Sequence, residues 1–177
     1  MTSEIPKKTK IRKELISYAK HAVIAVLLGL FIHHFVVAVN AQVPSASMEN
    51  TIMTNDRVVL NRLAYLFRDP QRYDIVVFNP PDGQEELFIK RIIGLPGETV
   101  MIFDGRVFAD GVLLNDSFIK ERAIGDFGPV IVPENSYFVL GDHRNNSHDS
   151  RTWQNTFLHR DEIVGRAVFR HRFNILR

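Results

Sequence analysis

The chain has 177 residues, of which 45% are hydrophobic and 24% charged, and it contains no cysteine. These values fit one modest folded domain with an appendage, and they exclude disulfides, thiol nucleophiles and thiolate metal sites. The formal net charge of +2 is too small to indicate a nucleic-acid partner. Positive charge gathers instead before the longest apolar run, at Lys7, Lys8, Lys10, Arg12, Lys13 and Lys20.

That apolar run, Ala22 to Val39, predicts a transmembrane helix. As a helix it is about 27 Å long, which is enough to cross the hydrocarbon core of a bilayer. His33 and His34 interrupt the run, and a neutral imidazole is tolerated there better than a fixed charge. The cations before the run favour a cytoplasmic N-terminus. We therefore expect a cytoplasmic basic segment over 1–20, an anchor over 21–40 and an extracytoplasmic domain over 41–177.

A cleavable signal peptide is the alternative interpretation of the same segment. The basic start, the apolar stretch and the small residues at Val39-Asn40-Ala41 all suit it. The run is somewhat long for a signal peptide, so we favour an uncleaved anchor. A buried helix of a soluble protein is a weaker alternative, because no polar residue marks one face before His33.

After Thr51 the sequence changes to short β-like runs separated by turn residues. Asp104-Gly105 between two such runs predicts a β-hairpin. Helical periodicity is weak, and its best candidate is a turn or two over Arg62 to Arg68. We predict a mainly β domain with few short helices, with strands at Val58–Leu60, Asp74–Phe78, Leu87–Ile93, Thr99–Phe103, Arg106–Ala109, Val112–Leu114, Ser136–Leu140 and Ile163–Phe169.

Two serines, Ser45 and Ser47, follow the apolar run closely. From Val39 to Ser47 the chain spans at most roughly 26 Å even when fully extended, so Ser47 acts near the membrane. Taken alone, serines in a loop are usually turn residues.

Lys90 stands in an apolar strand, on the face of Phe88 and Ile92, with Arg91 on the opposite face. An edge strand whose long cationic side chains reach solvent is one interpretation. In the other, Lys90 is desolvated, its neutral amine is favoured, and it can act as a general base.

The polar segment 141–151 follows the apolar run Tyr137 to Leu140 and predicts a hydrogen-bonded loop at a strand end. Its ionisable side chains are Asp142, His143, Arg144, His148, Asp149 and Arg151. The histidines and aspartates are of metal-ligand type, but the spacing of the histidines is not that of a helical pair and the arginines add competing charge. We expect no metal. A loop in which the two aspartates pair with the arginines is the other interpretation.

In this order behind an apolar helix, these segments resemble the bacterial type I signal peptidases. In that family the anchor leads into a P-S-x-S-M-x-P-T box, which Pro44 to Thr51 matches except at Asn50, where proline is usual. A G-D-x-V box is matched by 55–58, with Asn55 in place of glycine. The K-R-x-x-G-x-P-G-D/E box is matched fully by 90–98, and the G-D-N-R-x-x-S-x-D-S-R box by 141–151, with His143 for the usual asparagine. Four boxes in order, covering most of the chain, make the resemblance specific.

The resemblance implies a membrane-bound serine endopeptidase that removes signal peptides from secreted precursors, needs no cofactor or metal, and has a signal-peptidase/repressor-type β-domain. It implies that Ser47 is the nucleophile and Lys90 the general base, without a histidine. For a lysine to act near neutral pH its pKa must fall by roughly three units from about 10.4, a differential of about 4 kcal/mol.

The resemblance implies further roles around these two residues. The Ser45 hydroxyl and the Ser47 backbone N–H would form an oxyanion hole, and Ser147 would hold the lysine amine. The supporting loop residues would be Asp142, Arg144, Asp149 and Arg151. The substrate-binding residues would be Val43, Pro44, Met48, Phe88 and Ile89, from segments that pair with an extended peptide.

The expected partners are signal peptides and the lipid bilayer, with no nucleic acid, for a monomer in the bacterial cytoplasmic membrane. Self-cleavage at Ala41 stays open. A self-cleaving repressor-type protease is disfavoured, because DNA-binding helices are missing and the anchor contradicts it. A non-enzymatic anchored β-domain that binds a partner would have no use for Lys90 in an apolar strand beside two serine-bearing loops.

Overall fold

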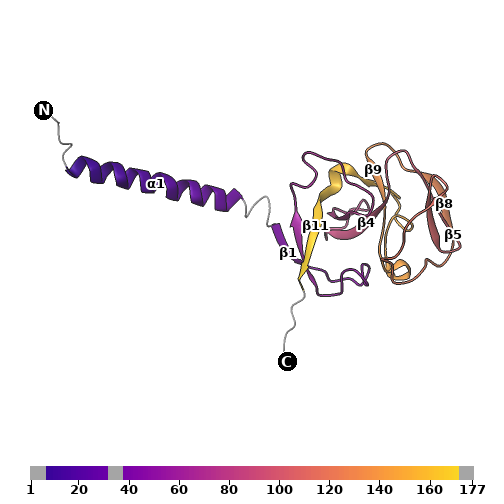
Figure 1. The fold of residues 1–177 in the computed structure, drawn as a ribbon. Coiled ribbons are helices and arrows are strands. Elements are labelled where there is room, and N and C mark those ends of the chain that lie inside the picture. The colour runs from indigo at the N-terminus through magenta and orange to yellow at the C-terminus, as the bar shows by residue number, and fades with distance from the viewer. Residues whose placement is uncertain (1–6, 32–37, 172–177) are drawn as a thin grey trace, which may run out of the picture.

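The computed structural model describes residues 7–31 and 38–171. The first element is one long helix, α1 (Lys7–Phe31), drawn in indigo in Figure 1. Within the described residues, Ile11–Phe31 is the one helical stretch whose length and hydropathy allow it to cross a membrane, and none of it is buried. The predicted anchoring helix is therefore present, but its bounds differ from the expected 21–40.

The helix begins earlier than expected because lysine, arginine, glutamate and leucine are all good helix formers, so the basic segment continues the helix. At the other end, Ala38–Gln42 form strand β1, which pairs with β2. Residues 38–40, expected at the end of the anchor, thus belong to the sheet. His33 and His34 lie outside the described residues. The division of the chain into cytoplasmic, membrane and extracytoplasmic parts stays a prediction.

A seven-stranded antiparallel sheet carries the β-domain. Its strands in spatial order are β1 (Ala38–Gln42), β2 (Arg57–Asn61), β11 (Ile163–His171), β3 (Ile75–Phe78), β4 (Phe88–Gly94), β9 (Ser136–Leu140) and β10 (Leu158–His159). The late strand β11 inserts between β2 and β3, so the two ends of the domain meet in the sheet (Figure 1). β4 lies inside the sheet, between β3 and β9.

A second, four-stranded sheet has the order β7 (Val112–Leu113), β6 (Arg106–Ala109), β5 (Thr99–Phe103) and β8 (Phe127–Ile131). The predicted hairpin at Asp104-Gly105 joins β5 and β6, and both turn residues have positive φ, 50° and 70°. Strand β8 was not expected, because its Gly128-Pro129 pair argues against a strand. It lies at the edge of the sheet, where the missing N–H of a proline can be tolerated.

The predicted strands are confirmed, and the mainly β fold with them. The short helix expected at Arg62 to Arg68 is wrong, because this segment forms turns. The Asn61 side chain accepts a hydrogen bond from the Leu63 N–H at 2.9 Å, which caps a tight turn at the end of β2. In the domain the described helices are single 3₁₀ turns, η2 (Arg144–Asn146) and η3 (Arg160–Glu162).

Three apolar clusters form the core. One of them positions the site: it packs residues after β1 against β2, β3 and β4, and consists of Val43, Met48, Ile52, Val58, Leu60, Val77 and Ile89. The loop that carries the two serines is thereby fastened to the strand that carries Lys90.

Candidate active site

Lys90 lies in the middle of the large sheet, with only 3% of its surface exposed. Its strand, β4, is covered on both faces, since every residue from Ile89 to Gly94 is buried. The edge-strand interpretation is thereby excluded. As the alternation predicted, the Lys90 amine is on the side of Phe88, with Nζ 5.2 Å from the centroid of that ring.

Ser47 begins a turn that is held by hydrogen bonds within its own backbone and by packing of one of its side chains in the core. The N–H groups of Thr51 and Ile52 donate to the Met48 carbonyl at 3.1 and 2.8 Å. The Met48 side chain, 0% exposed, anchors the turn in the core. Met48 was expected to bind substrate, but its side chain belongs to this cluster and is absent from the cavity lining. Ser47 itself is 4% exposed.

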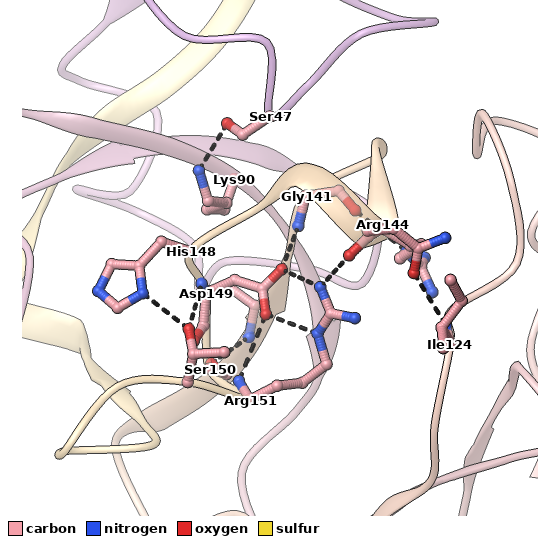
Figure 2. A network of polar contacts seen from close by, with 12 residues as sticks. Ser47, Lys90, Ile124, Gly141, Arg144, His148, Asp149, Ser150 and Arg151 are labelled. Carbon is pink, nitrogen blue, oxygen red and sulfur yellow. Dashed lines mark hydrogen bonds and ion pairs between the residues drawn. The ribbon is translucent and has the colours of Figure 1, made fainter.

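The two predicted catalytic side chains meet. Lys90 Nζ donates to Ser47 Oγ at 2.7 Å (Figure 2). It also donates to the Ile89 carbonyl at 3.1 Å. Burial lowers the pKa of the Lys90 amine from 10.5 to about 8, while the charges of Asp149 and Asp142 act in the opposite direction. A substantial neutral fraction of this amine therefore exists near pH 8, close to the value that base catalysis requires.

The Ser45 hydroxyl lies 3.2 Å from Ser47 Oγ, within hydrogen-bonding distance, so the two hydroxyls lie side by side. They open into a cavity of about 220 Å³. Of the predicted substrate-binding residues, Val43, Pro44, Phe88 and Ile89 line it. The sequence interpretation missed further lining residues, namely Ala46, Val58, Val77, Glu86, Leu87, Asn146 and His148. The alternation of β2 and β3 was a usable signal for Val58 and Val77, whereas residues on loops gave none.

Asp142 is fully buried and joins three segments. It forms a bidentate pair with Arg91 of β4, at 2.8 and 2.5 Å, and accepts a 2.5 Å hydrogen bond from the Thr51 hydroxyl. The expectation that Asp142 pairs with an arginine of its own loop is therefore corrected to a pair with Arg91. This bond ties the serine-bearing loop, the lysine strand and the polar loop together.

Asp149 occupies the centre of the polar loop (Figure 2). It accepts the Gly141 N–H at 3.0 Å and pairs with Arg151 at 2.8 and 2.9 Å, which agrees with the interpretation of this segment as an ion-paired loop. Arg144 is buried and forms no ion pair with a carboxylate among the described residues, and its Nε donates to the Gly141 carbonyl at 3.0 Å. Burial lowers the pKa of Arg144 to about 10.

Ser147 lies close to the turn that carries Ser47. A Cβ at Gly141 would overlap both the Ser147 hydroxyl and the Ser47 carbonyl oxygen, so these groups surround the same glycine. Ser147 Oγ is buried and has no hydrogen-bond partner within the described part of the chain. The expected bond to the Lys90 amine is thus not among the contacts of this structure, and the role of Ser147 stays a prediction.

The histidines of the polar loop diverge. His148 lies 2.7 Å from the Thr152 hydroxyl and stacks edge-on against Trp153, whereas His143 faces Glu49 and Glu121. In residues 7–31 and 38–171 no three histidine, aspartate or glutamate side chains converge as metal ligands would.

The two asparagines that depart from the resembled boxes both have positive φ, 91° at Asn50 and 69° at Asn55. Asparagine tolerates this region better than other non-glycine residues, so Asn55 replaces a glycine with little strain. A proline ring holds φ near −65°, so the turn at Asn50 differs from one built around proline. The Asn50 amide donates to the Phe118 and Ile119 carbonyls at 2.9 and 3.2 Å, which fixes the turn from outside.

Comparison with solved structures gives the class of the domain. The chain is similar to the crystal structure of a signal peptidase I from Enterococcus faecalis V583, with a TM-score of 0.50 and 34% sequence identity over 57% of this chain and 98% of that one. Among curated relatives, a probable signal peptidase I-2 from Synechocystis is 41% identical, over 96% of this chain and 82% of the relative. A signal peptidase I from Leptolyngbya laminosa is 43% identical, over 83% and 74%.

Residues 15–172 match the model of the family described as "Signal peptidase, peptidase S26", and the chain belongs to this family. The resemblance found from the four sequence boxes is confirmed. Members of the family remove signal peptides from secreted precursors, so the expected activity of a membrane-bound serine endopeptidase follows from membership. The long apolar helix α1 fits a membrane-anchored protein of this kind.

Proposed function

We propose that Ser47 is the nucleophile and Lys90 the general base by which this chain hydrolyses signal peptides. The observation that carries the proposal is the 2.7 Å hydrogen bond between a buried lysine amine and a serine hydroxyl at the wall of an apolar cavity. A serine becomes a good nucleophile when an adjacent base takes its proton, and a lysine can do so only in its neutral form.

In the proposed reaction, neutral Lys90 Nζ takes the proton of Ser47 Oγ as that oxygen attacks the scissile carbonyl carbon. The negative charge that develops on the carbonyl oxygen is met by the Ser45 hydroxyl and the Ser47 backbone N–H. The Lys90 ammonium then gives its proton to the leaving amine, and an acyl-enzyme ester remains on Ser47. Water, deprotonated by the same lysine, hydrolyses this ester and regenerates the free hydroxyl.

The cavity suits a substrate with small apolar side chains at the cleavage site. Its walls come from the segment around Val43 and Pro44 on one side and from Phe88 and Ile89 on the other. At about 220 Å³ the cavity has room for several short side chains of an extended peptide, and the restriction to small residues is proposed from the resemblance to signal peptidases. We infer that an extended signal peptide lies between these two segments, with its backbone parallel to them.

Asp142, Arg144, Asp149 and Arg151 are proposed to support the dyad by holding the loop that closes over β4. The catalytic domain is proposed to act outside the cytoplasm as a monomer anchored in the bacterial cytoplasmic membrane by α1, in contact with lipid. Self-cleavage at Ala41 requires β1 to leave the sheet, because Ala41 pairs with Val58 of β2.

The test is cleavage of a purified secretory precursor in detergent by the wild type, Ser47→Ala and Lys90→Met. Ser117→Ala serves as a matched control, because Ser117 is exposed and lies outside the cavity. We expect losses of about 10³-fold or more in both site variants and none in the control, with circular dichroism unchanged. Cleavage that survives Ser47→Ala contradicts the proposed dyad, and inactivity of the wild type favours a binding module.

A further inference from the structure

His143 contacts the peptide groups on both sides of the nucleophile. Its backbone N–H donates to the Ser47 carbonyl at 3.1 Å, and its ring Nδ1 lies 3.2 Å from the Ala46 carbonyl oxygen. The side chain is 14% exposed, so its ring is held inside the loop and is not free in solvent. No part of the proposed reaction uses this residue.

The bond to Ala46 bears on the oxyanion hole through the geometry of the peptide unit. In a planar trans peptide the carbonyl oxygen and the following N–H point in opposite directions. The direction of the Ala46 oxygen therefore sets the direction of the Ser47 N–H. That N–H donates no hydrogen bond to any described residue, which leaves it available to a substrate oxygen. The Ala46 oxygen also accepts the Glu49 N–H at 3.1 Å, so the His143 ring is a second contact that fixes this oxygen and, through the planar peptide, the direction of the Ser47 N–H.

The surroundings of the ring favour a donor at Nδ1. Glu49 Oε2 lies 3.6 Å from Nδ1, on the same side as the Ala46 oxygen, so this nitrogen faces acceptors only. Glu121 Oε1 lies 3.2 Å from Nε2. The one cation of this group is Lys120, which pairs with Glu49 at 2.8 Å. A ring that carries a proton on Nδ1 donates to Ala46, whereas a lone pair there would face oxygen.

We propose that His143 is a positioning residue, which orients the Ala46–Ser47 peptide through its Nδ1–H and so aims the Ser47 N–H at the oxyanion. The inference rests on the proposed role of Ser47. It predicts an effect on the transition state, where the oxyanion exists, and little effect on substrate binding, so kcat changes and KM does not.

Replacing His143 by asparagine or by glutamine distinguishes the proposed positioning role from a role in packing alone. The amide nitrogen of His143→Asn takes the position of Nδ1 and can still donate to Ala46. The amide of His143→Gln takes the position of Nε2, so the contact with Glu121 remains and the contact with Ala46 is lost. We expect kcat near the wild-type value for Asn, and about tenfold lower for Gln and for Ala, with KM within about twofold for all.

The measurements are kcat and KM for a precursor peptide, and the affinity of a peptide aldehyde whose hemiacetal with serine carries the oxyanion. The aldehyde should bind about tenfold more weakly to His143→Gln and as tightly to His143→Asn as to the wild type. Equal losses for Asn and Gln, or no loss for Gln, overturn the positioning role. Activity in Ser47→Ala contradicts the dyad itself, whereas a fully active His143→Gln in an enzyme that Ser47→Ala inactivates contradicts this inference alone.

Discussion

Replacing Lys90 by methionine should make the domain more stable at neutral pH while abolishing its activity. Lys90 is 3% exposed, and burial lowers the pKa of its amine from 10.5 to about 8. At 1.36 kcal/mol for each pH unit, the native state holds this ammonium at a cost of about 3 kcal/mol. Methionine has a similar length and no charge, so it removes that cost.

The gain is offset in part. The hydrogen bond from Lys90 Nζ to Ser47 Oγ is lost, which costs about 1 kcal/mol. We therefore expect Lys90→Met to be about 2 kcal/mol more stable than the wild type at pH 7. For a chain of this size the corresponding rise in Tm is roughly 4–8 °C.

The difference in stability between Lys90→Met and the wild type should decrease as the pH rises above 8. Between pH 8 and 10.5 the unfolded wild type binds more protons at this lysine than the native state does, so wild-type stability rises with pH there. The advantage of Lys90→Met is thus largest below pH 8. It disappears near pH 9.5, after about 1.5 pH units at 1.36 kcal/mol each, and by about pH 10.5 the variant is about 1 kcal/mol less stable because the lost hydrogen bond remains. Below pH 8 both states are protonated, and the advantage is constant.

The assay is denaturant unfolding in one detergent at pH 7 and pH 10, followed by tryptophan fluorescence from Trp153, which is buried in the core. Lys120→Met is the matched control: its lysine side chain is 43% exposed, and we expect a change of less than about 0.5 kcal/mol at either pH. A Lys90→Met protein that is less stable than the wild type at pH 7, or whose advantage persists unchanged at pH 10, would refute the reasoning.

Two further outcomes follow from the site. Since the neutral amine is the proposed base and its pKa is lowered to about 8, kcat/KM should fall about tenfold for each pH unit below pH 8; a rate that is flat from pH 9 to pH 5 excludes Lys90 as the base. Gly141→Ala places a methyl group against the Ser147 hydroxyl and the Ser47 carbonyl oxygen, so we expect kcat to fall by more than about tenfold in the precursor assay. Gly29→Ala, where the added methyl meets open space, is the control and should leave kcat unchanged.

Most of the fold could be predicted because the signals are local. Short apolar runs between Asp, Asn, Gly and Pro residues indicate strands and turns, and Asp104-Gly105 indicates a hairpin without reference to the rest of the chain. The errors fall where tertiary context decides. Residues 38–40 look like the end of an apolar helix, and they form a strand because β2 offers a partner. Residues 127–131 carry a Gly-Pro pair, and they form a strand only as an edge beside β5.

In the candidate site, too, local features could be predicted from the sequence, whereas contacts between distant residues could not. A buried lysine could be suspected from the apolar residues around Lys90, because alternation is a local property. Its contact with Ser47 joins residues 43 positions apart, and no periodicity reaches across that distance. Only the order of the boxes suggested the contact. The pair between Arg91 and Asp142, 51 positions apart, was missed, although both residues lie in matched boxes, because spacing does not say which arginine an aspartate meets.

The arginines around the site limit how far the nearby aspartates raise the pKa of Lys90. A base that depends on a lowered pKa cannot tolerate free carboxylates nearby, since each would favour the ammonium. Asp142 and Asp149 both raise the pKa of Lys90, yet each is bound to its own arginine, Arg91 and Arg151. The carboxylates can therefore organise the loops through hydrogen bonds while much of their charge is balanced locally. Desolvation stays the larger effect on the pKa of Lys90, so the polar network that holds the loops does not cancel the lowered pKa on which the proposed base role depends.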